Sequence, residues 1–302
     1  MNLGVTLGPV SLRSPLVAAS GTVGSVVDAA GAVDFTHYGA AVAKSVAGTP
    51  WPGRPAPRLA PTEAGMLNGI GIQNPGIEAW AAEIGGALGD LDVPVWGSAV
   101  GHTVDEFAEV AAGLEAAGVA AIEVNLSCPN LDHGEIWAHD ADLSRQVVSA
   151  VRAATTLPLG AKLSPNVPDV TPMAAAALEA GADWLVLTNT ALGAAIDIED
   201  RTPRLSGVTG GYSGPGLKPL SLRCVLQARR SLGPVPIVGT GGIRTGEDVI
   251  EYLMAGASAV GVGTGHFEDP KLAARLLREV GRWCARHGVS GLAELVGSGV
   301  PA

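Results

Sequence analysis

Short apolar segments recur along the chain, and amphipathic stretches separate them. Their length and their apolar character are typical of buried strands. The eight predicted strands are Pro15–Ala19, Ala40–Val46, Pro94–Val100, Ala120–Ser127, Pro158–Ser164, Trp184–Thr190, Pro236–Gly239 and Ala257–Gly263.

The stretches between these segments have the spacing of helices. In one of them, Phe107, Val110, Ala111, Leu114 and Ala117 fall on one helical face. Strands that alternate with helices through short connections predict a parallel sheet, and eight such units predict a closed (β/α)₈ TIM barrel. A barrel of this kind can account for residues 1–302 as a single domain.

The segment before the first predicted strand differs from the repeating units. Val5–Leu12 has the turn Gly8–Pro9 between two apolar runs. This pattern predicts an N-terminal β-hairpin that closes the bottom of the barrel.

Three connections are too long to be simple turns, namely Ala47–Gly76, Pro129–Asp140 and Ala191–Gly216. They follow the second, fourth and sixth predicted strands, so all three leave the C-terminal ends of strands. Barrel enzymes build their active sites on that face, and long loops in compact domains are usually functional. We therefore expect long active-site loops there.

Composition and charge limit the class of function. The 19 Lys and Arg residues against 29 Asp and Glu residues give a net charge of −10. Nucleic acids require clustered positive charge, so a nucleic-acid partner is not expected. The sequence has no apolar run of about 18 residues and no basic region followed by an apolar block in Met1–Pro15. We expect a cytoplasmic protein that does not bind a membrane.

The three cysteines are far apart in the sequence and form no C-x-x-C pair. The chain alone therefore predicts no metal site and no iron–sulfur cluster. Cys224 and Cys284 are typical of helices. Cys128 instead follows the fourth predicted strand, in the segment Asn125–Asn130.

Cys128 has more than one interpretation. A free cysteine is usually a small buried apolar residue. At the catalytic face, its thiolate could instead remove a proton from a carbon beside a carbonyl. His133 and His139 lie in the same connection and suggest a Cys–His nucleophile, although no third orienting group is evident.

Two lysines lie inside apolar runs near strand ends. Lys44 belongs to the second predicted strand and Lys162 to the fifth. A buried ammonium needs a partner, which an anionic or electron-rich ligand at the barrel mouth would supply. Alternatively, either lysine takes part in a salt bridge or extends its ammonium into water.

Glycine-rich turns follow the last two predicted strands, at Gly239–Ile243 and Gly261–Gly265. Such glycines let backbone N–H groups approach an anion, and barrel enzymes often hold a phosphate in these two loops. Alternatively, these glycines only allow the chain to form tight turns. A dinucleotide fingerprint fits less well, because these glycines close the array of units.

Four asparagines lie at strand ends or in the long connections: Asn68, Asn125, Asn130 and Asn189. An amide offers donors and an acceptor together, which suits a ligand with alternating ring N–H and C=O groups. Taken singly, an asparagine in a loop is usually a turn residue.

Together these motifs resemble the class 1 dihydroorotate dehydrogenases, from Ser14–Pro15 to Leu292–Gly297. The resemblance implies an FMN-dependent barrel in which Cys128 is the catalytic base and Lys44 lies beside flavin and substrate. The implied substrate-binding residues are Lys44, Asn68, Asn125, Asn130, Asn189 and Thr190. The implied FMN-binding residues are Ser20, Gly21, Lys44, Asn125, Lys162, Gly216, Gly241, Gly242, Gly263 and Thr264.

The activity implied by the resemblance is the oxidation of dihydroorotate to orotate in pyrimidine (UMP) biosynthesis. Cys128 would take a proton from C5 while hydride leaves C6 for flavin N5. A cation such as Lys162 would stabilise negative charge on the reduced flavin. The membrane-associated class 2 enzymes fit less well, because they use serine as the base.

The resemblance also concerns the electron acceptor. Leu67–Gly76 and Ser213–Pro219 are more similar to the NAD-coupled branch than to the fumarate-using branch. This implies an electron-transfer partner subunit with FAD and an iron–sulfur cluster, around a homodimeric core of this chain.

Two segments depart from the family pattern, both in loops expected to cover the substrate. Arg54 replaces an asparagine, and Asp132–Trp137 lacks a second glycine. Two alternatives therefore stay open: an oxidoreductase for another dihydropyrimidine or cyclic enamide, and a non-catalytic flavin-binding or scaffold subunit. The cysteine, the lysines and the asparagines favour an enzyme.

Overall fold

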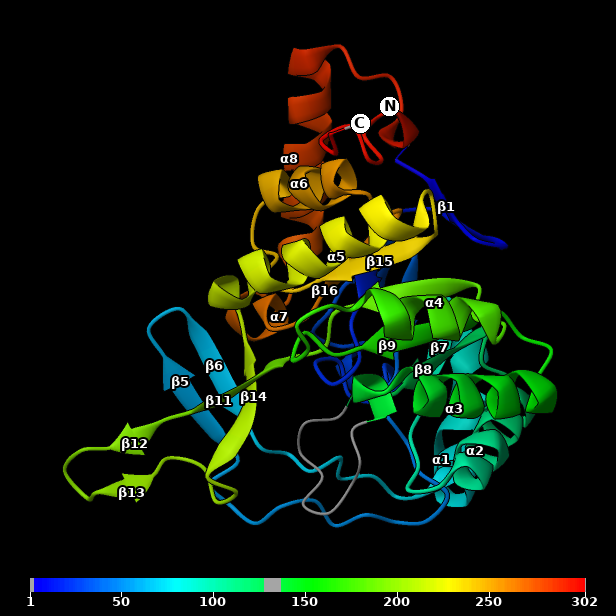
Figure 1. The fold of residues 1–302 in the computed structure, drawn as a ribbon, viewed down its shortest axis with the longest axis vertical. Coiled ribbons are helices and arrows are strands. Elements are labelled where there is room, and N and C mark those ends of the chain that lie inside the picture. Colours follow the sequence, from blue (N-terminus) through cyan, green and yellow to red (C-terminus); the bar gives the residue numbers. More distant parts are fainter. Residues whose placement is uncertain (1–2, 128–136, 302) are drawn as a thin grey trace.

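Eight parallel strands close into a barrel in the computed structural model, which describes residues 3–127 and 137–301 (Figure 1). The barrel strands are β3 (Leu16–Ala18), β4 (Ala40–Val42), β7 (Val95–Ala99), β8 (Ala121–Asn125), β9 (Leu159–Leu163), β10 (Trp184–Leu187), β15 (Ile237–Thr240) and β16 (Ala259–Val262). Strands that follow one another in this series are hydrogen-bonded neighbours, and β16 pairs with β3. Each predicted strand contains or overlaps one of them, so the predicted TIM barrel is confirmed.

Helices connect these strands and surround the barrel (Figure 1). They are α1 (Ile77–Ile84), α2 (Val104–Ala116), α3 (Ala141–Ala154), α4 (Thr171–Glu179), α5 (Lys218–Leu232), α6 (Gly246–Ala255), α7 (Gly265–Glu268) and α8 (Leu272–His287). Short 3₁₀ segments are η1 (Val27–Ala29), η2 (Phe35–His37), η3 (Gly85–Asp90), η4 (Trp137–His139), η5 (Pro215–Leu217) and η6 (Leu292–Glu294). The face predicted for α2 buries Phe107, Val110 and Leu114. Cys224 in α5 and Cys284 in α8 are buried, as helix residues of this kind usually are.

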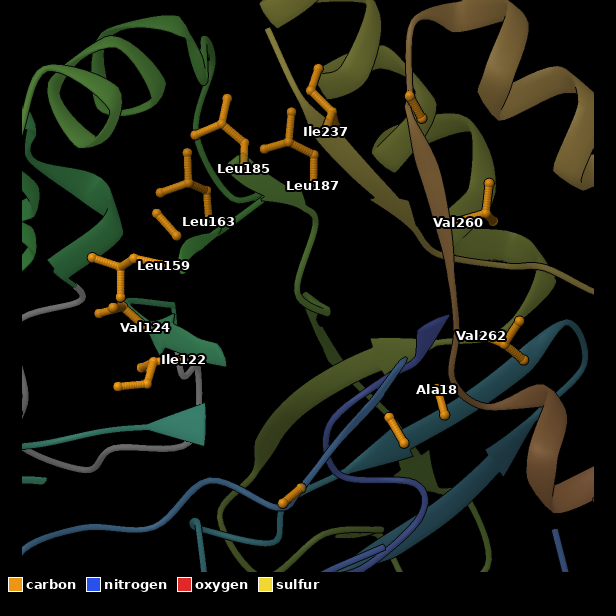
Figure 2. Close-up of a cluster of buried hydrophobic side chains, with 14 of the residues drawn as sticks. Ala18, Ile122, Val124, Leu159, Leu163, Leu185, Leu187, Ile237, Val260 and Val262 are labelled. Atoms are coloured by element: carbon orange, nitrogen blue, oxygen red, sulfur yellow. The ribbon is translucent and has the colours of Figure 1, made fainter. Parts of the chain in front are cut away.

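Side chains alternate between the two sides of the barrel wall, as the strand period of two requires. Apolar residues such as Val124, Leu163 and Leu185 pack outward under the helices (Figure 2). A second apolar cluster fills the inside of the barrel at the N-terminal ends of its strands, and we call it the lower interior cluster. In it, the rings of Trp96 and Trp184 lie 4.9 Å apart. Among the described residues, the inside of the barrel is therefore a packed core at the N-terminal ends of the strands, which leaves the C-terminal ends for a ligand.

The predicted N-terminal hairpin is confirmed. Strand β1 (Val5–Leu7) pairs antiparallel with β2 (Val10–Leu12). Leu7 and Leu12 belong to the lower interior cluster, so the hairpin closes that end of the barrel. Its Gly8 has a φ of 55°, which lies in the left-handed region, and a Cβ there would lie 2.9 Å from the Asp183 carbonyl oxygen.

Two of the long connections form a sheet that the sequence did not predict. Strands β5 (Leu59–Thr62) and β6 (Gly65–Asn68) pair with β11 (Ala191–Ala194) and β14 (Thr209–Ser213) in the antiparallel order β11-β14-β6-β5. The small hairpin of β12 (Ile196–Asp197) and β13 (Thr202–Pro203) extends beyond it (Figure 1, lower left). We call β5, β6, β11 and β14 the cap sheet.

Arg54, which departs from the family pattern, is buried beside the cap sheet. Its Nη1 donates to the Thr209 carbonyl oxygen at 3.0 Å, and its backbone N–H donates to Ile70 at 3.1 Å. A Cβ on Gly207 would lie 2.5 Å from the same guanidinium nitrogen. Arg54 therefore joins the connection after β4 to the connection after β10.

The helices of residues 3–127 and 137–301 include none that is both long and apolar enough to cross a membrane. The longest, α8, has 16 residues, whereas a span needs roughly 20 apolar residues.

Candidate active site

A cavity of about 280 Å³ opens at the C-terminal ends of the barrel strands, under the cap sheet. Most of the predicted binding residues line it, although they come from distant parts of the chain. Those residues are Ser20, Gly21, Lys44, Asn68, Asn125, Lys162, Asn189, Thr190, Gly241, Gly242, Gly263 and Thr264. Further lining residues that the sequence did not single out include Thr22, Ser45, Met66, Thr188 and Thr240.

Three predicted residues are not among the described residues that line the cavity. Gly216 lies between two lining residues, Pro215 and Leu217, and its own N–H donates to the Ala64 carbonyl at 2.9 Å. Cys128 and Asn130 lie outside the described residues. The described residues on either side of this segment lie next to each other, because the Ala138 N–H donates to the Leu126 carbonyl at 3.0 Å.

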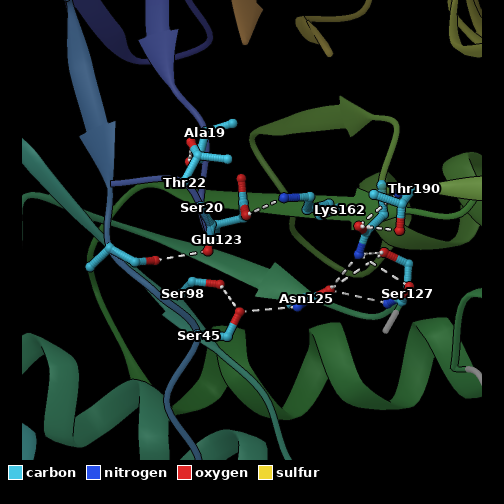
Figure 3. Close-up of polar contacts among 12 residues, drawn as sticks. Ala19, Ser20, Thr22, Ser45, Ser98, Glu123, Asn125, Ser127, Lys162 and Thr190 are labelled. Carbon is cyan, nitrogen blue, oxygen red and sulfur yellow. Dashed lines mark hydrogen bonds and ion pairs between the residues drawn. The ribbon is translucent and has the colours of Figure 1, made fainter. Parts of the chain in front are cut away.

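Two of the predicted asparagines, Asn125 and Asn189, line the cavity and are hydrogen-bonded to each other. Figure 3 shows Asn125 between Ser45 and Ser127. The Asn189 Nδ2 donates to Asn125 Oδ1 at 3.3 Å and to Ser127 Oγ at 3.0 Å. The Asn125 Nδ2 donates to Ser45 Oγ at 3.0 Å. These bonds fix the orientation of both amides before any ligand arrives, which lowers the cost of binding a ligand with complementary ring groups.

The wall formed by the cap sheet carries Asn68. Its Nδ2 donates to the Gly211 carbonyl of β14 at 3.1 Å. Gly211 also approaches the barrel so closely that a Cβ would lie 2.2 Å from Thr190 Oγ1. The cap sheet is thereby held directly against the loop after β10, and Asn68 faces the same cavity as Asn189.

Lys162 forms a buried ion pair. Its Nζ lies 3.2 Å from Glu123 Oε1, and the side chains are 7% and 3% exposed. The salt bridge left open by the sequence is therefore present, and Lys162 also lines the cavity. Sequence reasoning missed Glu123, although it is the one charged residue within Ala121–Asn125.

The glycines after β15 and β16 line the same cavity. Gly241 and Gly242 have φ values of 141° and 75°, which other residues rarely adopt. Gly263 is different, because a Cβ there would meet only Ala19 and Thr22, both at 3.8 Å. The chain itself has room for a side chain at position 263, so the glycine leaves that space open for a ligand. This cradle fits a phosphate group.

A buried histidine joins the loop after β3 to the cradle. The Tyr38 hydroxyl lies 2.7 Å from His266 Nε2, and Thr22 Oγ1 lies 2.9 Å from His266 Nδ1. The Thr22 hydroxyl donates to the Ala19 carbonyl at 2.9 Å, so its oxygen accepts from His266 Nδ1. His266 Nε2 then accepts from the Tyr38 hydroxyl. His266 is 4% exposed, and burial lowers its pKa from 6.5 to about 4. The ring is therefore neutral in the folded protein at neutral pH.

We expect the folded protein to lose stability through His266 as the pH falls from 6.5 towards 4. In this range the unfolded chain binds a proton on the ring and the folded chain does not, so stability present above pH 6.5 is lost on acidification. The loss is about 3 kcal/mol below the folded pKa. Urea unfolding at pH 7.0 and 4.5 measures it, and His266→Gln should show a smaller drop than the wild type. Equal drops would contradict the assignment.

The fold and the cavity define a class of protein: a (β/α)₈-barrel enzyme with a cavity at the C-terminal ends of its strands, lined by polar side chains and by glycine turns. The family model described as dihydroorotate dehydrogenase matches residues 2–283. The chain belongs to the dihydroorotate dehydrogenase family, and the predicted class 1 family and oxidoreductase activity are confirmed.

Similar proteins carry related names. The chain is 46% identical, over 97% of each chain, to the "Dihydroorotate dehydrogenase B (NAD(+)), catalytic subunit" of Pelobacter propionicus. A protein of Solibacter usitatus named "Putative dihydroorotate dehydrogenase A (fumarate)" is 43% identical over 98% of each chain. A solved structure of DHODH from Eimeria tenella with ferulenol shares the fold, with a TM-score of 0.84 at 22% identity, over 98% of this chain and 88% of that chain.

Proposed function

We propose that this chain is the FMN-containing catalytic subunit of an NAD-coupled dihydroorotate dehydrogenase, which oxidises dihydroorotate to orotate in pyrimidine biosynthesis. The observation that carries the proposal is the cavity itself, which brings Lys44, Asn68, Asn125 and Asn189 to one space with the glycine cradle. The family name of the relatives supports the same reaction.

FMN fits the donors around the cavity. Gly241, Gly242, Gly263 and Thr264 would hold its phosphate, because the cradle leaves room for an anion beside Gly263. Ser20, Gly21 and Lys162 line the remaining wall and would contact the rest of the cofactor. When bound, FMN supplies a hydride acceptor that no amino-acid side chain can provide.

The polar side chains would bind and orient the substrate. The amides of Asn125 and Asn189 are already fixed by each other and by Ser127. They would pair with the ring N–H and C=O groups of the pyrimidine, with Asn68, Asn130 and Thr190 around them. The Lys44 ammonium would balance the substrate's negative charge.

Cys128 would act as the general base. Its thiolate would take the proton from C5 of dihydroorotate, which lies beside a ring carbonyl and is therefore acidified. Its neighbour in the sequence, Ser127, is hydrogen-bonded to Asn189. Cys128 therefore directly follows a residue that contacts the proposed substrate-binding amides. The proton and the hydride leave from adjacent carbons, which gives orotate.

The electron acceptor distinguishes the two named branches of relatives. We expect dihydroorotate to reduce the flavin of the isolated chain, while NAD⁺ and fumarate reoxidise it slowly and artificial dyes or quinones do so rapidly. The chain's three cysteines are too far apart in sequence to ligate a cluster by themselves. A partner subunit with FAD and an iron–sulfur cluster would therefore pass the electrons to NAD⁺.

Steady-state turnover of the isolated chain with each acceptor measures this expectation. Rapid turnover with fumarate would place the chain with the relative named for fumarate instead. That outcome would change the acceptor and the partner but leave the oxidation of dihydroorotate untouched. The single domain 1–302, the homodimeric core and a cytoplasmic location stay predictions.

A further inference from the structure

We propose that Glu123 sets the reduction potential of the bound flavin by neutralising the charge of Lys162, which makes it a positioning residue that acts through the lysine. The inference rests on the proposed function, because it requires a flavin beside Lys162. It assigns a role in the reaction to a side chain that sequence reasoning did not single out.

The strand register places this ion pair inside the barrel. Ala121 belongs to the lower interior cluster, and the strand period of two puts Glu123 and Asn125 above it on the same face of β8. On β9, Gly160 pairs with Glu123 and Lys162 pairs with Asn125. Glu123 and Lys162 are therefore diagonal neighbours, and Figure 3 shows their side chains reaching each other.

Both charges are removed from water. The Glu123 side chain is 3% exposed and that of Lys162 is 7% exposed, with 3.2 Å between Oε1 and Nζ. Solvent therefore screens neither charge effectively, and each acts strongly on groups nearby. Lys162 borders the cavity, so its ammonium and the carboxylate that contacts it act together on whatever occupies that space.

Fold stability alone does not account for such a pair. Removing two ions from water costs free energy, and well-packed apolar residues of similar volume are often at least as stabilising. The lower interior cluster, which lies below this pair, is formed by apolar side chains such as Trp96, Ala121 and Val186. A charged pair at the top of that core is thus better explained by its effect on the ligand than by packing.

The direction of the effect follows from the signs of the charges. Reduction adds negative charge to the flavin, so a bare cation beside it favours the reduced form. The carboxylate of Glu123 offsets the ammonium of Lys162 and weakens that preference. Glu123 would thereby let a bound flavin accept hydride and still release its electrons readily to the next carrier.

The test compares the midpoint potential of the bound flavin in three variants, by equilibration with reference dyes at pH 6.5. Glu123→Gln should raise the ratio of reduced to oxidised flavin at a fixed applied potential by about tenfold, which is ~30 mV for a two-electron couple. Glu123→Asp keeps the charge and should stay within twofold of the wild type. Asp183→Asn, which removes the carboxylate of the Arg152 pair at the bottom of the barrel, is the matched control and should not change the ratio.

A ratio for Glu123→Gln within twofold of the wild type would overturn the inference. If that variant does not fold, the double variant Glu123→Gln/Lys162→Met decides. Its site is neutral, as the intact ion pair is, so the ratio should stay within about twofold of the wild type. A tenfold fall would show that Lys162 acts with its full charge and that Glu123 does not offset it. A protein that binds no flavin would instead contradict the proposed function.

Discussion

Replacing Cys128 with serine is expected to slow the reduction of the bound flavin by dihydroorotate by about 10²–10⁴-fold at neutral pH. A hydroxyl is a far weaker base than a thiolate unless another group activates it. Flavin binding should be unchanged, because the cradle and the lysines lie on, or directly after, strands other than β8. Anaerobic stopped-flow absorbance of the flavin measures the rate.

Cys284→Ser is the matched control for this experiment. Cys284 lies in α8 on the outside of the barrel, so its substitution should leave the rate of flavin reduction unchanged. A rate for Cys128→Ser within threefold of the wild type would mean that another group removes the proton.

Adding a methyl group at Gly263 is expected to weaken FMN binding by roughly 10–100-fold, without loss of stability in the flavin-free protein. The new Cβ meets only ordinary contacts at 3.8 Å within the chain, so it occupies space that the phosphate needs. Losing one charge-assisted hydrogen bond costs about 1.5–3 kcal/mol, which corresponds to this range of affinity. Flavin fluorescence titration and thermal unfolding of the Gly263→Ala protein measure both effects.

Gly281→Ala offers the matched control, because Gly281 lies in α8 and a Cβ there would meet no atom within 4 Å. It should bind FMN as the wild type does. Unchanged FMN affinity in Gly263→Ala would remove the cradle from the proposed phosphate site. Unfolding of Gly263→Ala would show instead that the glycine serves the fold.

The barrel could be predicted because its signal is local. Each strand, such as Leu159–Leu163 or Ala259–Val262, is buried from end to end, so it appears in the sequence as a short apolar run. The glycine turns follow the last two of these runs directly, and the two lysines lie near the ends of their runs. Their place at the barrel mouth then follows from the parallel direction of the strands.

The cap sheet could not be predicted in the same way. Strand β5 contains Pro61 and β14 contains two adjacent glycines, which are uncommon within strands. The pairing of Asn68 with Gly211 joins segments that are far apart in the sequence. No local sequence pattern predicts such a sheet, so these connections have the sequence character of irregular loops.

Within the site, partners were harder to predict than positions. The sequence placed Lys162 correctly at a strand end, but it gave no distance to the buried Glu123 on the next strand. His266 likewise stands directly after the predicted phosphate loop, yet its contacts with Thr22 and Tyr38 depend on how three segments meet. Such contacts become visible only when the fold is assembled.

The absorption spectrum of the purified protein, recorded before and after anaerobic addition of dihydroorotate, tests the central claim most directly. The account predicts a yellow protein whose flavin absorbance bleaches, with FMN as the chromophore released on denaturation and identified by its mass. A freshly prepared protein that contains no flavin, or a bound flavin that dihydroorotate leaves oxidised, would contradict it.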